Sequence, residues 1–117
     1  MHDVIYKICP AQAWARAEET GLFLGSAVDL QDGFIHFSSP DQVEETAARH
    51  FRGQTDLLLL AFRPQHLGEA LRWEPSRGGA LFPHLYGPLA VRLCEGRWAL
   101  GSGPDGEVLF PPHYRQG

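Results

Sequence analysis

Residues 55–63 read Thr-Asp-Leu-Leu-Leu-Leu-Ala-Phe-Arg, and this stretch decides the fold. It lies between Gly53 and Pro64, and its apolar centre has the length of a β-strand. A continuous apolar run of this length indicates a strand that is buried on both faces. We therefore expect residues 55–63 at the centre of a sheet.

The chain before this strand predicts two helices. Pro10 suits a first helical turn and Gly21 suits the position just past a helix end. Ser39 is the expected cap of the second helix, with Pro40 as its first helical residue and Gly53 as its stop. The expected elements are a strand at 4–9, a helix at 11–20, a loop at 25–33, a strand at 34–37 and a helix from residue 39.

The second half of the chain predicts short strands separated by turns rich in Gly and Pro. They are expected at 70–73, 89–94, 97–100 and 107–110. The fold class is therefore α+β, with two helices in the first half of the chain. A length of 117 residues fits one small single domain, which we expect at 1–117.

Composition limits the partners. The formal charge of -4 supplies no positive field for long nucleic acid, although it does not exclude a short nucleotide. The longest apolar run is too short to cross a membrane, and the N-terminus lacks the basic start of a secretory signal. Cys9 and Cys94 are interpreted as reduced, buried thiols. We expect a cytoplasmic protein that is a monomer or a homodimer.

The first candidate site surrounds His36 in residues 32–39, which read Asp-Gly-Phe-Ile-His-Phe-Ser-Ser. On a strand, His36 and Ser38 share one face, and Ser39 lies where a helix N-terminus offers free N–H groups. A histidine, hydroxyls and a helix N-terminus together can hold a phosphate or a ribose. The alternative is a structural histidine whose ring is satisfied within the fold.

The second candidate site is the segment Phe82-Pro-His-Leu-Tyr-Gly-Pro88. We interpret it as a rigid loop that presents His84 and Tyr86 to one side, or else as a structural turn. Lys7 either faces the same cleft or is an edge residue, and Glu74 either brings a carboxylate near the cleft or serves solubility. We expect His36 and His84 to be catalytic and the other groups to bind ligand.

Several motif-defined classes are disfavoured. A metal site would need histidines to converge from distant segments, because no local pair has ligand spacing, so no metal is expected. The Gly-x-Ser-x-Gly elbow and the glycine-rich dinucleotide and phosphate loops are absent from the sequence.

The chain resembles a bacterial family called domain of unknown function 952. The resemblance covers roughly residues 4–89. Its matching pieces are Ile5-Tyr-Lys-Ile8, Trp14, Gly21, Asp32-Gly-Phe-Ile-His-Phe-Ser38 and Phe82-Pro-His-Leu-Tyr-Gly-Pro88.

That family is in turn similar to the ADP-ribosyltransferase-like fold, a split and mostly antiparallel β-sheet whose enzymes hold NAD in a cleft. The resemblance implies that NAD is the ligand and that His36 contacts its ribose or a phosphate. In that arrangement we expect Tyr86 to stack on the base. Lys7 falls near the place of the first-strand ligand. The RNA 2'-phosphotransferases of this fold carry a histidine where Phe34 stands and an arginine where Asp32 stands, so the resemblance does not favour their reaction.

Three functions remain open. The first is an NAD-dependent ADP-ribosyl or related glycosyl transferase, for which Glu74 or Glu107 is the candidate carboxylate. The second is a non-catalytic module that binds a small ligand or a peptide in the same cleft. The third is a hydrolase or metal-assisted enzyme that uses both histidines.

Overall fold

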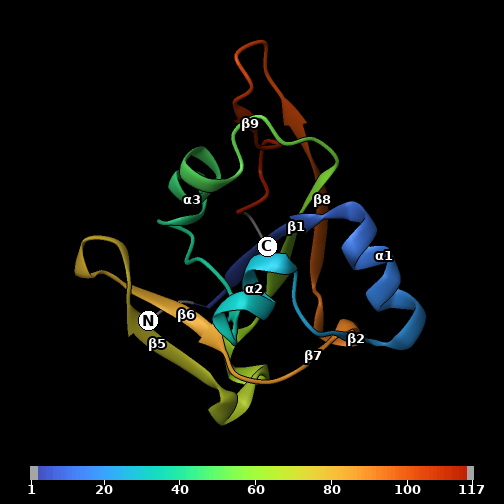
Figure 1. Cartoon of the computed structure of the whole chain (residues 1–117), viewed down its shortest axis with the longest axis vertical. Helices are drawn as coiled ribbons and strands as arrows, with labels where there is room; N and C mark the ends of the chain where they lie inside the picture. Colours follow the sequence, from blue (N-terminus) through green and yellow to red (C-terminus); the bar gives the residue numbers. More distant parts are fainter. Residues whose placement is uncertain (1–2, 116–117) are drawn as a thin grey trace.

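A computed structural model describes residues 3–115, apart from the side chain of Arg77 (Figure 1). The helices are α1 (Ala11–Thr20), α2 (Ala27–Asp32) and α3 (Val43–His50). The strands are β1 (Ile5–Pro10), β2 (Leu22–Phe23), β3 (Ile35–His36), β4 (Leu57–Phe62), β5 (Leu71–Pro75), β6 (Leu81–Leu85), β7 (Leu89–Ala90), β8 (Gly96–Ser102) and β9 (Val108–Leu109). Short 3-10 turns occupy Pro64–His66, Gly68–Ala70, Arg77–Gly79 and Val91–Leu93.

The strands form antiparallel sheets, and the α+β fold class is confirmed. One sheet has the order β1-β4-β8-β9, another has the order β3-β6-β5, and β2 pairs with β7. Every residue of β4 is buried, and β4 lies between β1 and β8, as the apolar run at 55–63 predicts. Among the described helices, none is long and apolar enough to cross a membrane.

The four-stranded sheet carries a core on each face. On one face, Cys9 of β1 and Phe62 of β4 pack against Trp14 of α1. On the other face, Ile8 of β1 and Leu59 of β4 pack against α3. Alternate residues of β1 therefore point to different cores, which places the Lys7 side chain on the α1 face.

The prediction of a loop at 25–33 is wrong, because α2 forms within this segment. Its first turn is closed by a capping box, in which Asp29 Oδ2 accepts a hydrogen bond from the Ser26 backbone N–H at 2.9 Å. Gly33 ends the helix with a φ of 87°, a left-handed conformation that glycine adopts without steric cost. The chain thus turns from β2 into β3 through a helix.

The second helix begins later than expected. Ser39 and Pro40 lie before α3 in a turn, in which Gln42 Oε1 accepts a hydrogen bond from the Ser39 backbone N–H at 3.0 Å. That side-chain contact closes the turn and delays the helix to Val43. The helix also ends at His50, before Gly53.

The prediction of a rigid loop at 82–88 is wrong for residues 82–85, because these residues belong to strand β6. Proline lacks a backbone N–H, but at Pro83 that group would point past the end of β3, so no bond of the β3–β6 ladder is lost. The Pro83 carbonyl still accepts a hydrogen bond from the Phe37 N–H at 3.0 Å. The strand expected at 89–94 is only two residues long, and a 3-10 turn follows it.

Candidate functional site

A buried carboxylate organises the candidate site. Asp29 is 1% exposed, and its oxygens accept hydrogen bonds from the Lys7 ammonium at 2.8 Å and from His36 Nδ1 at 2.6 Å. The Ser26 and His36 backbone N–H groups donate to it as well, at 2.9 and 3.1 Å. Burial by itself would raise the pKa of Asp29, but the bond from His36 and the charge of Lys7 hold that pKa well below its usual range.

His36 lies between two carboxylates. Its Nδ1 contacts Asp29, and its Nε2 lies 2.9 Å from Asp32 Oδ2 near the surface. Ionised carboxylates only accept hydrogen bonds, so a ring that carries protons on both nitrogens satisfies both contacts at once. One third of the His36 side chain is exposed, and the ring is therefore reachable on its Asp32 side.

His84 has a carboxylate partner of its own. Its Nδ1 lies 2.7 Å from Glu74 Oε1, and the Tyr86 hydroxyl donates to the same oxygen at 2.7 Å. These two hydrogen bonds lower the pKa of Glu74, and the bond to Glu74 raises the pKa of Tyr86. The ring of Phe34 stacks on His84 at a centroid distance of 4.1 Å, and its centroid lies 5.2 Å from that of Tyr86.

The two histidines face each other across a pair of strands. His36 of β3 and His84 of β6 are register partners, and their ring centroids are 5.6 Å apart. Register partners on antiparallel strands project to the same side of the sheet. Strand pairing therefore brings together two residues that are 48 positions apart in the sequence (84 − 36).

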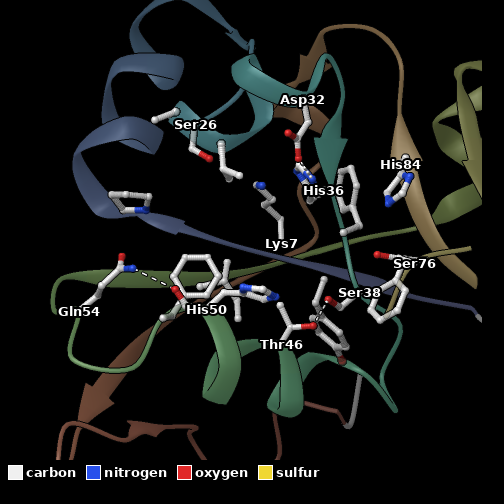
Figure 2. Close-up of a pocket in the computed structure, with 18 residues that line it drawn as sticks. Lys7, Ser26, Asp32, His36, Ser38, Thr46, His50, Gln54, Ser76 and His84 are labelled. Atoms are coloured by element: carbon white, nitrogen blue, oxygen red, sulfur yellow. Dashed lines mark hydrogen bonds and ion pairs between the residues drawn. The ribbon is translucent and has the colours of Figure 1, made fainter. Parts of the chain in front are cut away.

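Both histidines line a groove of about 580 Å³, a volume within the range of small-molecule sites. Figure 2 shows Ser26, Asp32 and His36 on one side of β1, with Thr46, His50 and Gln54 on the other. Lys7 extends from β1 toward His36, while Ser38, Ser76 and His84 lie at one end. The groove thus runs along β1, between α2 and α3.

The expected site residues divide into two groups. Lys7, His36, Ser38 and His84 line the groove, and Ser38 Oγ also lies 2.9 Å from Thr46 Oγ1. The groove lining does not include Ser39, Glu74 or Tyr86. Glu74 contacts the His84 ring and the Tyr86 hydroxyl outside that lining. Ser39 is buried in the turn before α3.

The model of a protein family described as "Protein of unknown function (DUF952)" matches residues 8–94. The chain belongs to the DUF952 family.

Two solved structures of one bacterial protein are similar to this chain. The crystal structure of protein CC0527 from Caulobacter crescentus is 52% identical, with a TM-score of 0.87 over 90% of this chain and 92% of that chain. The solution NMR structure of CC0527 is 50% identical, with a TM-score of 0.80 over 97% of this chain and 96% of that chain. No curated protein matches the chain significantly.

Sequence reasoning missed two residues that shape the site of this DUF952 protein. Asp29 was absent from the expected set because residues 25–33 read as a loop, although Ser26-Ala-Val-Asp29 has the spacing of a capping box. Phe34 contacts both histidine rings, since it stacks on His84 and its ring centroid lies 4.6 Å from that of His36. No local pattern distinguishes it from an ordinary strand residue.

Two further sequence expectations concern metals and thiols. Among residues 3–115, no group of three or more His, Cys, Asp or Glu side chains is arranged to hold a metal ion. Cys9 and Cys94 are both free thiols, but Cys94 is only half-buried, which corrects the expectation of two buried thiols. Burial raises the pKa of Cys9 to about 11, so that thiol is protonated and unreactive at neutral pH.

Proposed function

We propose that the groove of this DUF952 protein binds a nucleotide of the NAD class, in keeping with its resemblance to ADP-ribosyltransferase-like proteins. The observation that carries the proposal is the convergence of His36 and His84 on one groove of suitable volume. A structure with these histidines on opposite faces would have ruled the proposal out.

The side chains offer distinct contacts to such a ligand. His36 directs Nε2 toward Asp32 at the exposed side of its ring, where a ribose hydroxyl or a phosphate oxygen would bind. The Ser38 hydroxyl lines the same groove. Lys7 contributes little net attraction for phosphate, because Asp29 neutralises its charge at 2.8 Å. Tyr86 lies outside the groove lining, so it would stack only on a base that extends beyond the groove.

A transferase also needs a carboxylate to stabilise positive charge at the ribose. Asp29 is buried under three donor residues, and Glu74 is held by His84 and Tyr86. Asp32 is the carboxylate that lines the groove beside His36. We therefore assign this role to Asp32 in the transferase form of the proposal.

Binding without transfer is the second candidate. It is favoured by the contact between Asp32 Oδ2 and His36 Nε2, which engages the groove carboxylate within the protein. In that case the nucleotide would bind with its glycosidic bond intact.

The test is a calorimetric titration with NAD that also follows nicotinamide release. The variants are His36→Ala and, as a matched control, His66→Ala, because His66 lies outside the groove lining. Saturable binding that His36→Ala loses and His66→Ala keeps, with both variants folded, would support the proposal. Nicotinamide release would add transfer, and its absence would favour binding alone. An absence of binding at millimolar NAD would refute the nucleotide proposal.

A further inference from the structure

Residues 24–33, here called the α2 segment, are held to the rest of the fold by a polar contact. Asp29 is the only buried residue of the segment, whereas Phe23 before it and Ile35 after it belong to the core. A helix that buries no apolar side chain gains little from packing, so the position of this segment depends on the contacts of Asp29. The large apolar side chains of the segment are exposed, namely Leu24, Val28 and Leu30.

Each end of the α2 segment turns at a glycine. Gly25 has a φ of 126° and Gly33 has a φ of 87°, both in the left-handed region that glycine adopts readily. Between them, the Leu30 N–H donates to the Ser26 carbonyl at 3.0 Å and the Gly33 N–H donates to the Asp29 carbonyl at 2.8 Å. These bonds lie within the segment. Rotation at the two glycines therefore moves it as one body, in the manner of a hinged loop.

The donors that hold Asp29 come from the body of the fold. The ammonium of Lys7, on β1, lies 2.8 Å from Asp29 Oδ2 and 3.0 Å from Oδ1. His36, on β3, donates to Oδ1 from its Nδ1 at 2.6 Å and from its backbone N–H at 3.1 Å. Two strands thus direct an ammonium, an imidazole N–H and a backbone N–H at one carboxylate. Groups of these three kinds bind phosphate and carboxylate oxygens in proteins.

We propose that these donors form a binding site for a phosphate or carboxylate group of a ligand, and that Asp29 occupies this site while the α2 segment is closed. When the segment rotates away, Asp29 enters water and the oxyanion of the ligand takes its place on Lys7 and His36. The buried ammonium of Lys7 keeps a negative partner in both states, so the exchange avoids the cost of an unpaired buried charge. The inference rests on the proposed function, because a nucleotide of the NAD class would bring its pyrophosphate to this site.

The site opens onto the groove. Lys7 and His36 line the groove, and Ser26 and Asp32 of the α2 segment line it on the same side of β1 as His36 (Figure 2). Movement of the segment therefore exposes the donors to a ligand in the groove. In the wild type such a ligand competes with Asp29, so its apparent affinity is reduced in proportion to the fraction of molecules in which the segment is open.

The first test uses the wild-type protein, with inorganic phosphate and acetate as probes at constant ionic strength. Nuclear Overhauser effects between the Lys7 and Asp29 side chains report the closed segment directly. We expect the anion to weaken them, because it selects the open state. Effects between Lys7 and Phe23, whose ring centroid lies 5.9 Å from the Lys7 ammonium, should persist and serve as the internal control. The probe that acts at the lower concentration identifies the preferred group as a phosphate or a carboxylate.

The second test compares variants by calorimetric titration with the same anions. Asp29→Asn removes the competing charge, and Asp41→Asn is its matched control, because the Asp41 side chain is 79% exposed and lies outside the groove lining. We expect Asp29→Asn to bind the anion about tenfold more tightly than Asp41→Asn, which should resemble the wild type. The double variant Lys7→Met/Asp29→Asn replaces the buried ion pair with neutral side chains and should lose the binding. If Asp29→Asn does not fold, the wild-type measurement decides.

Several outcomes would overturn the inference. One is a contact between Lys7 and Asp29 that neither anion weakens in the hundred-millimolar range. Another is equal anion affinity of folded Asp29→Asn and Asp41→Asn. Anion binding that survives in the double variant would place the anion elsewhere on the protein and would also overturn it. Phosphate binding at Lys7 without NAD binding would refute the nucleotide proposal alone, whereas NAD binding that leaves the contact between Lys7 and Asp29 intact would refute this inference alone.

Discussion

At the scale of single residues, Asp29 connects stability to the candidate site. Its two oxygens receive the Lys7 ammonium and the His36 ring, and the buried Lys7 side chain has only 3% of its surface exposed. Removing one partner of a buried ion pair is costly, because the other charge is left without compensation. The same carboxylate therefore fixes the orientation of His36 and compensates the buried charge of Lys7.

The pKa of Asp29 makes this stabilisation dependent on pH. Because that pKa is depressed in the folded state, its contribution is complete above the unfolded value of about 3.9 and is lost as pH falls toward the folded value. We expect urea denaturation to show a steep loss of the free energy of unfolding below about pH 4 in the wild type. In Asp29→Asn, we expect a loss of about 3–5 kcal/mol at neutral pH and a smaller acid dependence.

The control is Asp32→Asn, which removes a partly exposed carboxylate beside the same histidine. We expect it to cost at most about 1 kcal/mol. Equal destabilisation by the two substitutions would contradict the role assigned to the buried carboxylate.

At the scale of elements, α2 positions the site. Its first turn places Asp29 under β1, and its last residue, Asp32, reaches His36. A helix of six residues gains little from intrinsic propensity, so its caps and its packing matter more than usual. Ser26 supplies the N-terminal cap, since its side-chain oxygen accepts a hydrogen bond from the Asp29 backbone N–H in the capping box.

We expect Ser26→Ala to lower the free energy of unfolding by about 1 kcal/mol, the usual cost of removing a serine cap. Amide hydrogen exchange should quicken first within residues 27–32, because the cap acts locally. Ser102→Ala, at the exposed end of β8, is the control and should be close to neutral. A uniform change in exchange across the chain would contradict a local role for the cap.

At the scale of the whole molecule, the C-terminal segment completes the second core. Tyr114 is buried, and its ring lies 5.5 Å from Tyr6 and 5.2 Å from Phe110 by centroid. Its hydroxyl donates to Glu44 Oε2 of α3 at 2.5 Å. Burial and this hydrogen bond raise the pKa of Tyr114. Tyr114 is thereby fixed against Tyr6 of β1 and Glu44 of α3, and α3 forms one wall of the groove.

We expect Tyr114→Ala to lower the free energy of unfolding by about 3–5 kcal/mol, because it leaves a cavity among aromatic rings. Tyr114→Phe keeps the ring and should cost only about 0.5–1.5 kcal/mol for the lost hydrogen bond. Thermal unfolding of both variants separates the two contributions. If the alanine variant were as stable as the phenylalanine variant, the segment would not belong to the core.

The sequence alone determined the strands that bury both faces and the helix whose ends carry strong local signals. The apolar run at 57–62 indicates a strand that is buried on both faces, and Gly21 ends α1 with the left-handed φ of 89° that glycine favours. The sequence also indicated His36 and His84 as candidate site residues, because each is an ionisable side chain within an apolar and aromatic segment.

Only the tertiary structure decided how those residues meet. Pairing of β3 with β6 sets His36 opposite His84, and the packing of α2 brings Asp29 to Lys7 across 22 positions. The position of β1 at the end of its sheet is likewise a property of the sheet order, which local patterns do not encode. The physical reason is that periodicity fixes which face a residue takes, whereas register and packing between distant segments fix what that face meets.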